Sequence, residues 1–112
     1  MTANQLAWLW VVLAGCMEII WVVGLKRTEG FTKLGPSVIT IAIMAASFVL
    51  LSQALRVIPI GTAYAVWTGI GAAGAAAAGI LLFGESANPL RIACIALIIA
   101  GIVGLKLLPA QP

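Results

Sequence analysis

LAWLWVVLAGCMEIIWVVGL, residues 6–25, is a run of twenty residues in which Glu18 is the only charged side chain. A helix of about 20 mostly apolar residues is long enough to cross the hydrocarbon core of a bilayer. Three further stretches meet this requirement, over residues 36–55, 60–83 and 89–108. The sequence therefore predicts an all-α integral membrane protein, a bundle of four transmembrane helices that forms a single domain over residues 1–112.

The composition of the chain argues against several classes of soluble protein. Hydrophobic residues make up 63% of the chain and charged residues 8%, which is far from the proportions of an ordinary soluble domain. The net charge of +3 is scattered, with no basic cluster larger than Lys26 and Arg27, so no nucleic acid is expected as a partner. The chain has no His, and Cys16 and Cys94 lie inside apolar runs, so we expect no metal, no cofactor and no enzyme active site.

The basic residues bear on how the helices are oriented in the membrane. Four of them are predicted on one side and two on the other: Lys26, Arg27, Lys33 and Arg91 against Arg56 and Lys106. Because cytoplasmic loops carry the excess of Lys and Arg, this bias weakly favours both termini outside. A difference of two charges is small, so insertion in both orientations stays open.

Glu18 lies near the middle of the first predicted span, a few ångströms from the bilayer midplane at 1.5 Å per helical residue. An acid at this depth costs about 2.5 to 3.5 kcal/mol on insertion scales, so such residues usually face a cavity and serve a function. Desolvation disfavours the ionised carboxylate, and the group is therefore expected to bind either a proton or a cation, which is the chemistry of antiport. The alternative is a protonated acid that makes one interhelical hydrogen bond.

Aromatic residues are predicted near this acid. Gly15, Glu18 and Trp21 share one face of a helical wheel, and Tyr64 and Trp67 lie three residues apart in the third span. Aromatic faces around a carboxylate suit an organic cation, through cation–π attraction and shape. The alternative for each aromatic residue is a role in packing or at the membrane interface.

Small residues dominate the third span, which reads GIGAAGAAAAG over residues 69–79. Small side chains let helices approach closely, and Gly69 and Gly71 are in addition candidates for a bend in the helix. Four helices enclose a cation path poorly, so we expect a homodimer that brings two Glu18 side chains into one chamber.

Five segments together resemble the small multidrug resistance family, and more closely its guanidinium-exporter branch. They are AGCMEIIWVVGLK (14–26), GFTKLGPSVIT (30–40), PIGTAYAVWTGIGAAGA (59–75), LLFGESANPLR (81–91) and GIVGLK (101–106). The resemblance runs from about Ala7 to Lys106. It implies a proton-coupled exporter of guanidinium or small guanidinyl cations that works as an antiparallel homodimer in the bacterial inner membrane.

The resemblance also implies roles for individual residues. Glu18 is the shared proton and substrate carboxylate. The residues that line the site are Trp21, Tyr64 and Trp67, with Gly15 and Ser47 in the polar network around the acid. Gly69 and Gly71 match the bending point of the third helix. The paired-glycine dimer motif of the last helix is half present, with Gly101 at one position and Cys94 at the other, and Lys106 matches a basic position typical of the guanidinium branch.

Three functions are open at this point. Guanidinium is planar and pairs with carboxylates in bidentate fashion, which favours its export through a pair of glutamates. The second is broad export of quaternary ammonium and lipophilic cations by the same machinery. The third is a non-transporting membrane subunit whose Glu18 pairs with a basic residue of another protein.

Overall fold

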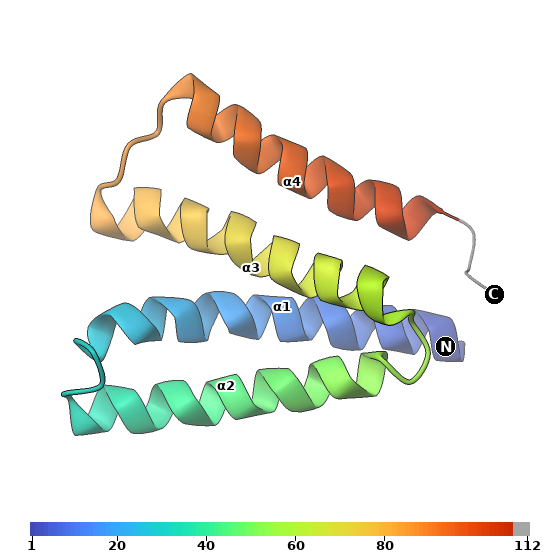
Figure 1. Cartoon of the computed structure of the whole chain (residues 1–112), viewed down its shortest axis with the longest axis horizontal. Helices are drawn as coiled ribbons and strands as arrows, with labels where there is room; N and C mark the ends of the chain where they lie inside the picture. The colour runs from blue at the N-terminus through green and yellow to red at the C-terminus, as the bar shows by residue number, and fades with distance from the viewer. Residues whose placement is uncertain (109–112) are drawn as a thin grey trace.

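The computed structural model describes residues 1–108 (Figure 1). Within that range the chain forms α1 (Ala3–Arg27), α2 (Leu34–Ala54), α3 (Ile60–Phe83) and α4 (Pro89–Leu107), and no strand. Each of these helices is long and apolar enough to cross a membrane. The predicted all-α class with four membrane helices is confirmed. The single domain over residues 1–112 stays a prediction, and its last four residues lie outside the described part.

α1 and α2 begin two to three residues before the predicted spans, whereas α3 and α4 begin at the predicted residues. α1 begins at Ala3 because the Thr2 side chain accepts a hydrogen bond from the Gln5 backbone N–H, and the Gln5 side chain accepts one from the Thr2 N–H. α2 begins at Leu34, which leaves Pro36 in its first turn, where the missing N–H costs no helical bond. The Asn88 side chain caps α4 by accepting from the Arg91 N–H at 2.8 Å.

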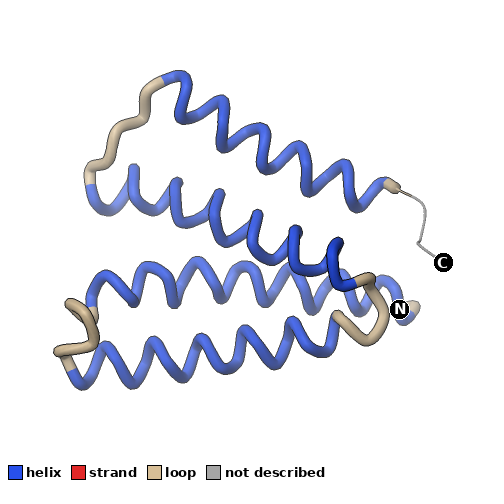
Figure 2. Tube along the Cα trace, viewed as in Figure 1, coloured by secondary structure: helices blue, strands red, loops and turns tan. Residues whose placement is uncertain are grey.

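Each helix runs antiparallel to the one before it in the chain, so the α1–α2 and α3–α4 loops lie at the same end of the bundle (Figure 2). α1 lies between α2 and α3 and packs along both of them, whereas α4 packs along α3. The buried core comes from α1, α2, α3 and the loop that joins α2 to α3. It consists mainly of small or β-branched side chains: Ala7, Val11, Ala14, Ala54, Ile58, Ala63, Val66 and Trp67. Within residues 1–108, α4 adds no buried residue, because its side chains cover α3 on one side only.

Candidate functional site

Glu18 projects from the middle of α1 toward α3, and its carboxyl group lies against the backbone of Gly71. A Cβ atom at position 71 would overlap the Cδ and Oε1 atoms of Glu18 and lie 2.8 Å from its Cγ. The Oε1 atom is buried and has no hydrogen-bond partner within residues 1–108. Gly71 therefore forms a recess that only a residue without a side chain can provide.

The contacts on either side of Glu18 set the spacing of α1 and α3. Gly15 of α1 receives Ile70 of α3, whose Cβ would lie 2.8 Å from a Cβ added at Gly15. One turn later the small and the large residue change helices, because Ile19 of α1 packs against Gly74 of α3. Small residues on both helices thus allow the close approach that places the acid against α3.

A buried hydrogen-bonded junction joins α1, α2 and α3 one helical turn before Glu18. The Ser47 hydroxyl of α2 donates to the main-chain carbonyl of Ala14 at 2.8 Å, and the Trp67 indole N–H of α3 donates to the Ser47 hydroxyl at 3.1 Å. In α1 the N–H of Glu18 is directed at that same carbonyl, through the i to i−4 pattern of the helix. The Ser47 junction therefore fixes the helix turn that carries the acid, without a direct bond to its carboxylate.

Aromatic rings from α1, α2 and α3 form a continuous chain on this side of the bundle. Trp21 meets Phe48 edge-on with ring centroids 6.3 Å apart, Phe48 lies 5.7 Å from Trp67, and Trp67 lies 5.7 Å from Tyr64. The Trp21 indole nitrogen is buried and has no hydrogen-bond partner in the described part of the chain. The structure thus brings all three predicted aromatic residues into one group.

This aromatic chain is open along one side. Trp67 is 7% exposed, but Phe48 is 47% exposed and Tyr64 is 56% exposed. Large aromatic side chains so exposed beside a membrane acid leave a face that a ligand or another protein surface can cover.

The remaining predicted residues lie away from the carboxyl. Gly69 faces α4, where a Cβ would lie 2.9 Å from the end of the Ile102 side chain, and α3 is an unbroken helix through this region. Nothing lies within 4 Å of a Cβ built at Gly101, and Cys94 is exposed. The Lys106 ammonium lies 4.8 Å from the ring centroid of Trp8, at the opposite end of the bundle from the α1–α2 loop.

Two features of the site were not predicted from the sequence. Phe48 joins Trp21 to Trp67, and its signal was available, because it is the only aromatic residue between positions 36 and 55 and it follows Ser47. The role of Gly71 as a recess for the carboxyl carried no such signal. A glycine in a stretch of glycine and alanine does not reveal which neighbour it faces.

An acid with a free acceptor oxygen can take up a proton or a cation. Within residues 1–108 neither ion pair involves Glu18: they join Lys33 to Glu29 and Arg91 to Glu85. Trp21 follows Glu18 by three residues on α1, and Trp67 precedes Gly71 by four residues on α3, so the acid and the aromatic chain share the same faces of these two helices. One negative charge near several π faces suits a small organic cation.

Comparison with known proteins identifies the family. The family model described as Small Multidrug Resistance protein matches residues 6–98. Proteins named Guanidinium exporter from Citrobacter freundii, Salmonella typhimurium and Escherichia coli (strain K12) are each 59% identical over 102 residues, which is 91% of this chain and 97% of theirs. These relatives are transporters rather than enzymes, and the extent of both matches shows that the chain belongs to the small multidrug resistance family, as a multi-pass membrane protein.

Proposed function

We propose that this chain exports guanidinium or small guanidinyl cations in exchange for protons, with Glu18 as the shared binding group. One observation carries the proposal: a carboxyl with a free, buried oxygen beside an aromatic chain, in a protein 59% identical to proteins named Guanidinium exporter. A guanidinium ion presents its N–H groups in a plane, and two of them match the two oxygens of a carboxylate.

Exchange follows from competition for one charge. A carboxylate away from water is neutralised either by a proton on an oxygen or by a bound cation, and each excludes the other. Export of one guanidinium therefore requires that the proton leave Glu18 first, and reloading of the proton expels the cation. Trp21, Tyr64 and Trp67 line the cation site, and Ser47 and Gly15 hold α1 in register with α2 and α3.

We further propose an antiparallel homodimer in the bacterial inner membrane. The exposed rings of Phe48 and Tyr64 and the open surface around Gly101 support a second copy that completes the enclosure. The small difference in basic residues between the two sides supports opposite insertion of the two subunits. In such a pair Gly69 and Gly71 let α3 bend as access alternates between the two sides.

Reconstituted transport tests the proposal. Proteoliposomes that contain only this protein are expected to release protons when guanidinium is added outside, and Glu18→Gln, which keeps the shape but loses the proton site, abolishes the flux. The matched control is Glu85→Gln, the same chemical change in the α3–α4 loop, where the carboxylate pairs with Arg91 instead. Retained exchange in Glu18→Gln would place the coupling group elsewhere.

A second cargo class is favoured by the exposed aromatic faces of Phe48 and Tyr64, which also suit quaternary ammonium and lipophilic cations. The same vesicles separate the two. Proton flux with guanidinium and little with tetraphenylphosphonium supports the guanidinium exporter, and the reverse supports the broad exporter. Absence of flux with either cation, from a folded protein, supports a non-transporting subunit.

A further inference from the structure

The end of the bundle that holds the α1–α2 and α3–α4 loops, here called the basic end, carries unbalanced positive charge. Of its four basic residues, two are paired: Lys33 Nζ lies 3.4 Å from Glu29 Oε2, and Arg91 Nη2 lies 2.6 Å from Glu85 Oε1. Lys26 and Arg27 have no carboxylate partner within residues 1–108. Two cations therefore remain at this end.

The contacts of these two residues leave their charge available. Lys26 places its ammonium 4.6 Å from the ring centroid of Phe83 at the end of α3, and a ring attracts a cation without neutralising it. Lys26 and Arg27 also form the last turn of α1, where the helix dipole offers roughly half a negative elementary charge. That is less than the two positive charges present.

Two cavities meet at Arg27. One of about 460 Å³ is lined by Lys26, Arg27, Glu29, Lys33, Pro36 and Phe83. The other, of about 340 Å³, is lined by Gly24, Arg27, Gly35, Pro36, Ile39 and Thr40. The first is lined by three basic side chains and by the Glu29 carboxylate that pairs with Lys33, which leaves a net positive charge. The second continues along the apolar start of α2 toward the bilayer core. This gradient from charged to apolar matches a molecule with a charged head and a hydrocarbon tail.

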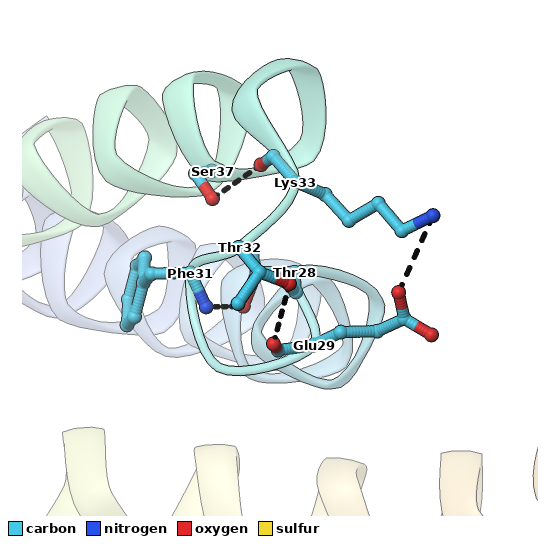
Figure 3. A network of polar contacts seen from close by, with 6 residues as sticks. All are labelled: Thr28, Glu29, Phe31, Thr32, Lys33 and Ser37. Atoms are coloured by element: carbon cyan, nitrogen blue, oxygen red, sulfur yellow. Dashed lines mark hydrogen bonds and ion pairs between the residues drawn. The ribbon is translucent and has the colours of Figure 1, made fainter.

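The loop that positions these residues is held by its own hydrogen bonds (Figure 3). Thr28 is buried, its hydroxyl donates to the Leu25 carbonyl at 2.7 Å, and it accepts from the Phe31 N–H at 3.1 Å. The Thr32 hydroxyl donates to the Glu29 carbonyl at 2.8 Å. A loop ordered in advance loses less conformational entropy when a ligand binds to it.

We propose that the basic end binds the headgroup of an anionic phospholipid. The Arg27 guanidinium faces the phosphate, whose oxygens it can contact in bidentate fashion, and Lys26 adds the second unpaired positive charge beside it. The acyl chain follows Pro36 and Ile39 along α2. This site is separate from Glu18 and does not depend on what the protein transports.

Native mass spectrometry of the full-length protein, with phosphatidylglycerol and phosphatidylcholine of the same acyl chains, tests the proposal. A basic residue near a membrane surface contributes about fivefold to the attraction of anionic lipid. We therefore expect the preference for phosphatidylglycerol to fall about thirtyfold in the double variant Lys26→Gln/Arg27→Gln. The swapped variant Lys26→Arg/Arg27→Lys keeps both charges and is expected to keep most of the preference.

The matched control removes two charges from the opposite end, as Arg56→Gln/Lys106→Gln, and is expected to retain the preference. An equal loss in both double variants would show that only total charge matters and would overturn the proposal, as would an unchanged preference in Lys26→Gln/Arg27→Gln. Displacement of phosphatidylglycerol by millimolar inorganic phosphate would overturn it in favour of a soluble anion. Glu18→Gln is expected to bind the lipid like the wild type even where transport is lost, which separates this site from the proposed transport function.

Discussion

A methyl group added at Gly71 is expected to displace the Glu18 carboxyl and impair transport. In Gly71→Ala the new Cβ would lie 2.8 Å from Glu18 Cγ and overlap Cδ and Oε1. Non-bonded carbon atoms prefer separations of about 3.5 to 4.0 Å. The Glu18 side chain must therefore move by roughly 1 Å, a displacement that can reduce the rate of a positioned reaction ~100-fold. We expect guanidinium-driven proton flux in proteoliposomes to fall between ~10-fold and ~100-fold.

Gly71→Ala is expected to lower the free energy of unfolding only slightly, although it lowers the proton flux strongly. Overpacking costs about 1 to 3 kcal/mol, and replacing a helical Gly with Ala returns about 1 kcal/mol through helix propensity. The thermal midpoint in detergent is therefore expected to shift by a few degrees, with the protein still folded. A large loss of flux from a folded variant would locate the defect at the carboxyl.

Two variants in the same helix serve as controls. Gly61→Ala adds its methyl to open space and is expected to transport normally. Gly69→Ala meets the Ile98 and Ile102 side chains of α4 and leaves the Glu18 carboxyl in place, so it measures the contribution of the proposed bend in α3 alone. Wild-type flux in Gly71→Ala would refute the recess. Equal losses in Gly69→Ala and Gly71→Ala would instead point to bending of α3.

Three further outcomes are expected. Ser47→Ala leaves the buried Trp67 indole N–H without its acceptor, which costs about 1 to 3 kcal/mol and lowers the thermal midpoint. An unchanged midpoint in Ser47→Ala would rule out the junction. Phe31→Gly relieves the backbone strain of a residue held at φ 63° and is expected to stabilise the α1–α2 loop by up to ~1 kcal/mol. Thermal unfolding measures this, and a lower midpoint than that of the wild type would contradict it. Trp21→Phe removes a buried N–H that has no described partner and keeps an aromatic ring against Phe48, so the thermal midpoint should fall only slightly while the guanidinium affinity changes. A large fall in the midpoint would indicate a structural role for the indole.

The fold was predictable because the requirement for a membrane span is simple. Length and hydropathy place a helix wherever about 20 apolar residues follow one another, and polar caps such as Asn88 mark where it begins. A span predicted from hydropathy leaves out the polar residues that extend a helix beyond the apolar run. The predicted span therefore began at Leu6, whereas α1 begins at Ala3. The capping pair of Thr2 and Gln5 was present in the sequence and accounts for the difference.

The candidate site was predictable only in part. Glu18 stands out by its depth, but a helix that is apolar on all sides gives no indication of which face meets which neighbour. That Gly69 faces α4 while Gly71 faces Glu18 depends on the rotation of α3, which is set by packing with two other helices. The position of Phe48 depends on the same packing. Its residue type was visible, whereas its neighbours were not.

The acceptor at the Ser47 junction is a main-chain carbonyl rather than a side chain. Every amino acid supplies that oxygen, so substitutions at position 14 can change the local volume but cannot delete the acceptor. Genetic variation can break the link only from the donor side, at positions 47 and 67. Among homologous sequences, the residue at position 14 should therefore be limited only by its size. The residues at positions 47 and 67, which supply the two donors, should change together.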